Sequence, residues 1–175
     1  KESNGSVNVT NQSGSTLFVR IVNTGLPAPG EETAVKSNLG LTVRYTDMEG
    51  HNLSPASLKR GTDFKAVYTV YNPGTMGPLP NVALTTRFPP GWEIYNERLL
   101  GTGESHQSFS YQDVRDDRVM TYFSIPPNQS KSFTIRLNAA YKGRYYLPAV
   151  KVGEMYMQDV QAVIPGRWIE VHAVQ

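Results

Sequence analysis

Apolar and polar residues alternate in many short runs along this chain, a pattern typical of half-buried β-strands. The clearest run is Asp63–Tyr71, which places Phe64, Ala66, Tyr68 and Val70 on one face. The pattern predicts strands at Ser6–Thr10, Thr16–Val22, Leu41–Tyr45, Asp63–Tyr71, Val82–Phe88, Trp92–Tyr95, Ser108–Val114, Arg118–Ile125, Ser132–Ala139, Arg144–Leu147, Met155–Met157, Val160–Ile164 and Trp168–Val174. No run predicts a helix of more than a few turns.

Turn residues separate these runs at short intervals. The chain contains 15 Gly and 12 Pro. Asp47–Gly50 and Asn72–Gly74 combine residues that tolerate positive φ with Pro at its preferred turn position. Arg115–Asp117 and Pro126–Gln129 are compact polar tips between strands. Many short strands with turns at this spacing predict an all-β fold, an antiparallel β-sandwich of the immunoglobulin-like kind.

A Pro- and Gly-rich stretch at Leu26–Asn38 marks a domain boundary. Before it lie two predicted strands, of which Thr16–Val22 is apolar on both faces and is expected to be central in a sheet. Two strands cannot bury a face on their own. They must therefore pack on the following domain, or they close a sandwich whose other strands precede this chain.

Composition narrows the function classes. The 175 residues include 39% hydrophobic and 18% charged residues, which is typical of a globular protein, and the net charge is +2. The basic residues are scattered, so no nucleic-acid or anionic-lipid footprint is visible. The absence of cysteine excludes thiol nucleophiles, thiolate metal sites and disulfides. No segment is long and apolar enough for a membrane-spanning helix. The chain opens at Lys1, so we expect any targeting signal to lie outside it.

Two groups of acidic residues raise catalytic or metal-binding hypotheses. Asp113, Asp116 and Asp117 would supply oxygen ligands to a divalent cation. Arg115 and Arg118 lie in the same segment, which favours a solvated hairpin tip with local ion pairs. Glu93 and Glu97 beside Trp92 suggest a glycosidase carboxylate pair, but nothing fixes their separation. His51, His106 and His172 are isolated and lack metal-ligand spacing.

Aromatic residues are the strongest local feature. Tyr141, Tyr145 and Tyr146 fall within six positions of one another, and Trp92 accompanies the preceding strands. An exposed platform of such rings would bind a sugar or a partner protein. Strand periodicity favours rings that alternate into the core, or a tyrosine that pins a loop through its hydroxyl.

Three segments together resemble a known family. They are Val82–Tyr95 (VALTTRFPPGWEIY), Tyr111–Phe123 (YQDVRDDRVMTYF) and Ala139–Val150 (AAYKGRYYLPAV), the last followed by Glu154-Met155-Tyr156. In this order and spacing they are similar to the C-terminal part of bacterial α2-macroglobulin-like proteins, particularly the large Bacteroidetes type. The N-terminal segment Leu17–Pro27 resembles the strands that follow the thioester domain in that family.

The resemblance implies a domain arrangement and a role. Residues 39–175 would be the last macroglobulin-type sandwich, and residues 1–38 the closing strands of a CUB-like segment plus a linker. The role would be that of a non-catalytic structural or interaction domain of an exported, broad-spectrum protease-trapping inhibitor, located in the periplasm or at the outer membrane. In the family, tyrosines of the last domain can shield a thioester, but no motif assigns one here.

The resemblance also implies the partners. These would be the thioester-type and macroglobulin domains of the same polypeptide and, through the whole protein, target proteases. We expect no nucleic acid, no membrane contact by this chain, and no catalytic residue, cofactor or metal. Trp92, Tyr141, Tyr145 and Tyr146 are the candidate contact residues. The alternative hypothesis is a carbohydrate-binding or adhesin-like module of an exported protein.

Overall fold

The structure is a computed structural model that describes residues 8–20, 28–95 and 109–173. Within these ranges the chain forms strands and no helix. The strands are β1 (Val35–Ser37), β2 (Gly40–Thr46), β3 (Ser57–Lys59), β4 (Asp63–Asn72), β5 (Leu79–Arg87), β6 (Trp92–Ile94), β7 (Tyr111–Val114), β8 (Arg118–Ile125), β9 (Gln129–Ala139), β10 (Gly143–Leu147), β11 (Val150–Glu154), β12 (Gln161–Ile164) and β13 (Arg167–His172).

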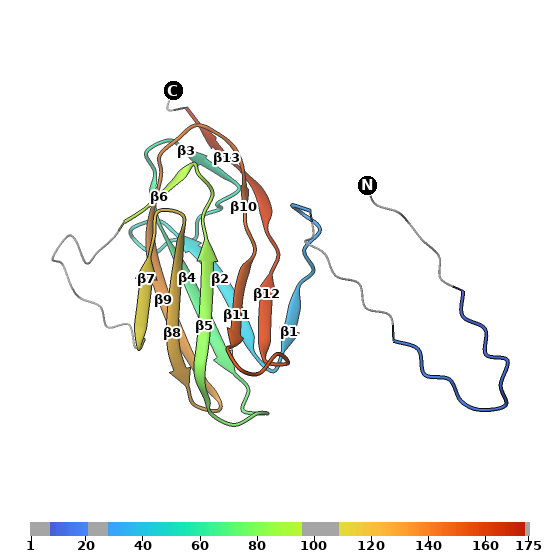
Figure 1. Cartoon of the computed structure of the whole chain (residues 1–175). Coiled ribbons are helices and arrows are strands. Elements are labelled where there is room, and N and C mark those ends of the chain that lie inside the picture. The colour runs from blue at the N-terminus through green and yellow to red at the C-terminus, as the bar shows by residue number, and fades with distance from the viewer. Residues whose placement is uncertain (1–7, 21–27, 96–108, 174–175) are drawn as a thin grey trace.

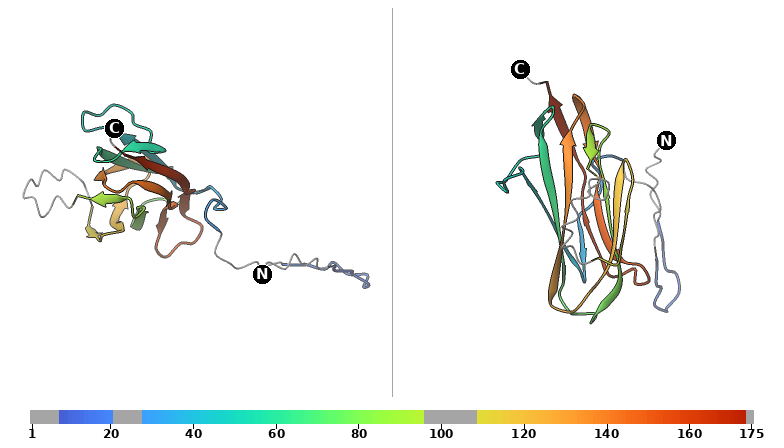
Figure 2. Two further views of the ribbon diagram at one scale, coloured as in Figure 1. Left: turned by 90° about the horizontal axis from the view of Figure 1, so that it is seen from above. Right: turned by 90° about the vertical axis from the view of Figure 1, so that its left-hand side faces the viewer.

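Two sheets face each other to form the sandwich, and a third, smaller sheet lies at one end (Figures 1 and 2). One layer has the order β1-β12-β11-β5-β8-β7 and the other has the order β2-β4-β9-β6. The end sheet has the order β10-β13-β3. Neighbouring strands are antiparallel except β13 and β3, which run parallel. The predicted all-β, antiparallel sandwich is therefore confirmed.

Alternation builds the core between the two large sheets. In β4, Phe64, Ala66, Tyr68 and Val70 are all buried and the residues between them are more exposed, as the period of two predicts. Rings from both layers meet in the middle, where the Phe123 and Phe133 centroids lie 4.6 Å apart. At the end nearer the third sheet, Phe64, Trp92 and Tyr45 form edge-to-face and tilted pairs.

Two proline breaks create the end sheet. β10 is followed by β11 after only Pro148 and Ala149, and β12 is followed by β13 after only Pro165 and Gly166. Because proline has no backbone N–H for a ladder, the paired ribbon is interrupted at both positions. β11 and β12 pair within the large sheet, whereas β10 and β13 pair with each other beyond the break.

Most predicted strands from Leu41 onward are present, with shifts of a few residues at their ends. One prediction was wrong. Met155–Met157 is a bend and loop, and the strand is Val150–Glu154, in which Val150, Val152 and Glu154 are buried. Gly153 has no side chain and Pro148 is unfavourable in a strand, so this alternation is difficult to recognise from the sequence. The short strands β1 and β3 were not predicted.

The N-terminal strand predictions also fail where the structure describes them. Residues 8–10, from the predicted strand Ser6–Thr10, and residues 16–20, from Thr16–Val22, are not in strands. Phe18 is 91% exposed, and Leu17 and Val19 are also exposed. Thr16–Val22 was expected to be a central strand. Its described part contacts no sheet, so its apolar side chains remain in water.

Candidate functional site

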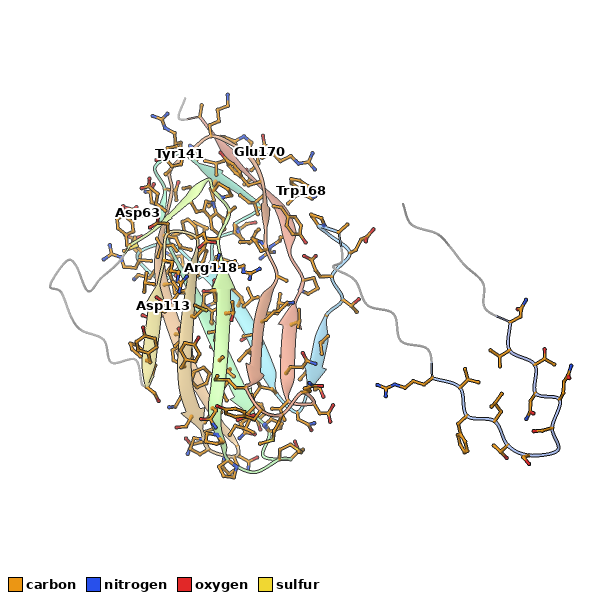
Figure 3. All side chains as sticks on the ribbon, in the orientation of Figure 1. Asp63, Asp113, Arg118, Tyr141, Trp168 and Glu170 are labelled. Carbon is orange, nitrogen blue, oxygen red and sulfur yellow. The ribbon has the colours of Figure 1, made fainter. Side chains whose placement is uncertain are left out.

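The four predicted contact residues have different surroundings. Trp92 is only 3% exposed and packs edge-on against Phe64, so it belongs to the core. Tyr141 follows β9 and is 56% exposed, and Figure 3 places it at the same end of the sandwich as Trp168 and Glu170. Its hydroxyl donates to Oε1 of Glu93 at 2.9 Å. That carboxylate raises the pKa of Tyr141.

Tyr145 has a structural role. Its ring lies directly over the backbone of Gly91, and a Cβ added at Gly91 would overlap the ring. Its hydroxyl donates to the carbonyl oxygen of Lys142 at 3.0 Å. The ring therefore packs the Pro-Pro-Gly turn before β6 against β10, and the hydroxyl bonds to the loop between β9 and β10.

Tyr146 holds a segment that is far away in sequence. Its hydroxyl accepts a hydrogen bond from the backbone N–H of Gly30 at 2.7 Å and donates one to Oε2 of Glu32. The Tyr146 hydrogen bond lowers the pKa of Glu32. Burial, followed by the Glu32 carboxylate, raises the pKa of Tyr146. This contact joins the residues before β1 to the end sheet.

Trp168 extends the same surface, and the sequence analysis missed it. It lies opposite Tyr146 in the β10–β13 ladder, with ring centroids 5.5 Å apart in an edge-on arrangement. The guanidinium carbon of Arg144 lies 4.8 Å from the Trp168 ring centroid. Trp168 is 51% exposed. Alternation in Arg167–His172 was the available signal, since it places Trp168, Glu170 and His172 on the outer face.

Tyr146, Trp168 and Arg144, with Tyr141 at the same end, form what we call the end surface. Tyrosine, tryptophan and arginine are the residue types enriched at the energetic centres of protein interfaces. Each is held in place by a neighbour on the same sheet or at the same end, so little side-chain freedom remains to be lost on contact. The end surface is therefore the candidate contact surface among the described residues.

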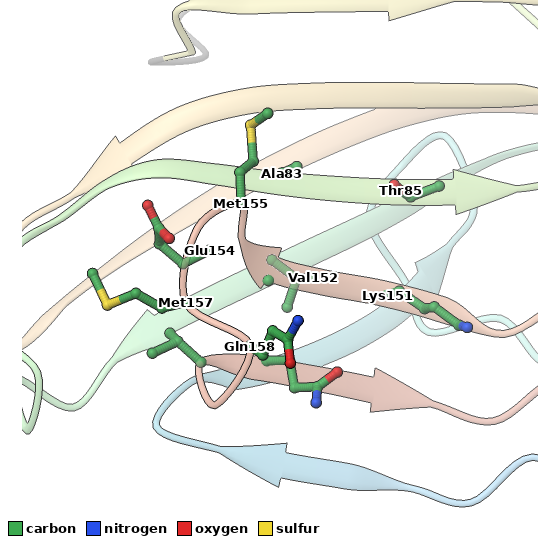
Figure 4. Close-up of a pocket in the computed structure, with 11 residues that line it drawn as sticks. Ala83, Thr85, Lys151, Val152, Glu154, Met155, Met157 and Gln158 are labelled. Carbon is green, nitrogen blue, oxygen red and sulfur yellow. The ribbon is translucent and has the colours of Figure 1, made fainter. Parts of the chain in front are cut away.

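A shallow groove lies on the outer face of the large sheet (Figure 4). Ala83, Gly153 and Met155 are among the residues that line it. Glu154 is buried, and its carboxylate accepts a hydrogen bond from the backbone N–H of Tyr156 at 2.7 Å. Its carboxylate therefore has a structural partner in the loop that follows β11.

The acidic hairpin consists of local ion pairs. Arg115 Nε lies 2.9 Å from Oδ2 of Asp113, and Arg118 makes two hydrogen bonds of 2.8 Å to the carboxylate of Asp117. The Arg118 hydrogen bond lowers the pKa of Asp117. No cluster of three or more potential metal ligands occurs among the described residues. This geometry fits the interpretation of the acidic segment as a solvated hairpin tip with local ion pairs.

The remaining predicted residues are not brought together. Glu97 and His106 lie outside the described residues, and Glu93 is paired with Tyr141. His51 contacts Oδ2 of Asp47 at 3.0 Å within an exposed turn.

His172 has partners that the sequence did not suggest. Its Nε2 lies 2.9 Å from Oγ of Ser57, and its Nδ1 lies 3.5 Å from Oε1 of Glu170. This places a hydroxyl, an imidazole and a carboxylate in the order found in hydrolases. All three side chains are exposed on the outer face of β3 and β13. Water therefore screens the charges that such a triad uses.

The described residues contain no helix that would be long and apolar enough to span a bilayer.

One comparison with known protein families gives a match. A family model described as the bacterial alpha-2-macroglobulin MG10 domain matches residues 39–159. A comparison with curated proteins found no match.

Solved structures show the same fold. A trypsin-activated alpha-2-macroglobulin from Escherichia coli matches with a TM-score of 0.72 and 18% identity, over 82% of this chain and 11% of that one. A native Escherichia coli fragment from domain MG7 to the C-terminus matches with a TM-score of 0.71 and 19% identity, over 83% and 25%. A Salmonella alpha-2-macroglobulin reacted with methylamine matches with a TM-score of 0.70 and 20% identity, over 80% and 10%.

Proposed function

Because this chain belongs to the bacterial alpha-2-macroglobulin MG10 domain family, we propose that it is a structural and interaction domain of a protease-trapping inhibitor. The observation that carries this proposal is the family match over residues 39–159. The chain spans only 10–25% of the solved alpha-2-macroglobulin chains described above. Trapping would therefore be an activity of a larger polypeptide to which this domain contributes a rigid part.

We propose that residues 39–175 form the C-terminal macroglobulin-type domain and that residues 1–38 close a CUB-like sandwich and link it to this domain. The family match begins at residue 39, which supports the boundary. β1 lies just before that boundary and pairs with β12 at the sheet edge. The exposed Leu17, Phe18 and Val19 are what a strand separated from its sheet would present.

The end surface would contact neighbouring domains of the same polypeptide. Tyr141 and Tyr146 remain in the proposed contact set, and Trp168 and Arg144 join it. Trp92 and Tyr145 are removed from it, because the first is buried and the second is committed to packing on Gly91. Target proteases would meet this domain only through the whole inhibitor.

We further propose that the protein is exported and acts in the periplasm or at the outer membrane, as the resemblance implies. The alternative, a carbohydrate-binding module, would require an aromatic face free to stack on a sugar. Trp168 is the exposed tryptophan, but Arg144 lies over its ring and Tyr146 meets it edge-on. This arrangement favours a protein contact over a sugar platform.

The trapping proposal is tested with the full product of the reading frame that encodes this chain. After incubation with trypsin, we expect cleavage of a small chromogenic peptide to persist while cleavage of casein falls about tenfold, because a caged protease excludes large substrates. The 175-residue chain alone, as the control, should change neither rate. Equal loss of both activities in the full product, or inhibition by the chain alone, would contradict the proposal.

A non-catalytic role predicts that the Ser57, His172 and Glu170 group is inert. Hydrolysis of p-nitrophenyl acetate by the chain should agree within about twofold between wild type and His172→Gln, because an exposed imidazole gains little from a screened carboxylate. His51→Gln, at another exposed histidine, is the matched control. A His172-specific loss accompanied by acetylation of Ser57 would overturn the non-catalytic assignment.

A further inference from the structure

The residues just before β1 form a tight turn that is closed by a tyrosine from another sheet. The backbone N–H of Glu31 donates to the carbonyl oxygen of Ala28 at 2.9 Å. Gly30 adopts a φ of +96°, which favours glycine. This conformation directs the N–H of Gly30 to the Tyr146 hydroxyl at 2.7 Å, with Oε2 of Glu32 at 3.1 Å.

Gly30, Glu32 and Tyr146 thus form a closed hydrogen-bonded ring. The Tyr146 hydroxyl accepts from Gly30 and donates to Glu32, while the Glu32 carboxylate also accepts from Gly30. Hydrogen bonds to a carboxylate are stronger than neutral ones. The ring of Tyr146 is itself fixed against Trp168. The Tyr146 hydroxyl on β10 is therefore already oriented to accept one hydrogen bond from the segment and to donate another to it.

The same segment is held a second time only a few residues later. β1 pairs with β12 through Val35, Lys36 and Ser37. β12 belongs to the large sheet, whereas Tyr146 belongs to the end sheet on the other side of the proline breaks. Residues 30–37 therefore cross the junction between two sheets and are fastened to both.

We propose that Tyr146 and Glu32 form a latch that fastens the N-terminal segment across this junction and fixes the point and direction at which the preceding chain meets the sandwich. Tyr146 is a positioning residue in this device. The segment that this latch holds is the chain's own Ala28–Glu32 turn. The consequence for the arrangement of neighbouring domains rests on the proposed function, but the latch itself is a property of this chain.

Amide hydrogen exchange of Gly30, followed by NMR, tests the latch directly. Tyr146→Phe removes only the hydroxyl and should raise the Gly30 exchange rate by about five- to tenfold, the population change expected for one lost hydrogen bond. Glu32→Ala should act in the same direction. Tyr145→Phe is the matched control, because the Tyr145 hydroxyl donates to the carbonyl oxygen of Lys142 and does not contact the Gly30 N–H, so it should leave the Gly30 exchange rate unchanged.

A distance measurement tests whether the latch fixes the direction of the segment. The chain has no cysteine, so Ala28→Cys with Ser124→Cys gives a unique pair of spin-label sites. The distance distribution should be narrow in this background and about twofold broader when Tyr146→Phe is added. The melting temperature of each variant reports whether the sandwich itself remains folded.

Two results would overturn the latch. One is an unchanged Gly30 exchange rate in Tyr146→Phe with the sandwich intact. The other is a distance distribution that is already broad without this substitution. Neither result depends on protease trapping, so a failed casein assay with a confirmed latch would reject the proposed function alone.

Discussion

Replacing Phe64 with alanine is expected to lower the free energy of unfolding by about 3–5 kcal/mol, the range observed for large-to-small changes at buried phenylalanines. Phe64 is fully buried near the start of β4. Its ring lies 4.9 Å from that of Trp92 and 6.4 Å from that of Tyr45, measured between centroids. Truncation would remove both aromatic contacts and leave a cavity that strands on either side cannot collapse to fill.

Chemical denaturation followed by circular dichroism measures this loss. Val67→Ala is the matched control, because Val67 lies on the opposite face of the same strand and is only partly buried. Val67→Ala should lower the free energy of unfolding by less than about 1.5 kcal/mol. A loss for Phe64→Ala that is no larger than that of Val67→Ala would show that the face of β4 assigned to the core is wrong.

Replacing Asn72 with alanine is expected to lower the free energy of unfolding by about 2–4 kcal/mol, because it removes three side-chain hydrogen bonds, one of them buried. Asn72 is fully buried at the end of β4. Its Nδ2 donates to the carbonyl oxygens of Gly77 at 2.9 Å and Ile125 at 3.2 Å. Its Oδ1 accepts from the backbone N–H of Gly74 at 2.9 Å. One amide thus fastens the β4–β5 turn to the end of β8.

Two further substitutions separate the amide's hydrogen bonds from its bulk. Asn72→Asp keeps the size and the acceptor but cannot donate to the two carbonyls when ionised, so it should be at least as destabilising as Asn72→Ala. Asn81→Ala, at an exposed position in β5, should change stability by less than about 0.5 kcal/mol. An Asn72→Asp protein as stable as wild type would contradict the role assigned to the amide donor.

The strands that could be predicted from the sequence are those with a regular local alternation of apolar and polar residues. β4 buries every second residue along its whole length, and β9 does so from Phe133 to Ala139, so their pattern is visible without any structure. β11 follows Pro148 and contains Gly153, and both residues weaken a period-two pattern. Thr16–Val22 shows the opposite failure. Its apolar pattern is that of a strand, but strand formation needs a neighbouring strand with which to pair.

The end surface illustrates why the candidate site was only partly predictable. The cluster of Tyr141, Tyr145 and Tyr146 drew attention to the correct part of the chain. Which tyrosine packs inward and which binds another segment depends on partners that are distant in sequence. Tyr146 and Glu32 are 114 positions apart, and the pairing that brings Trp168 beside Tyr146 is set by the β10–β13 register. No local pattern encodes either contact.

The proline breaks have a mechanical consequence. β10 continues into β11, and β12 continues into β13, through only two residues each. A pull or push on the end sheet is therefore passed to the large sheet along two covalent backbones, without relying on side-chain packing. The end sheet is also joined to β9 through residues 140–142 and to β4 through residues 60–62, so a change in its angle would have to bend all four short connections together.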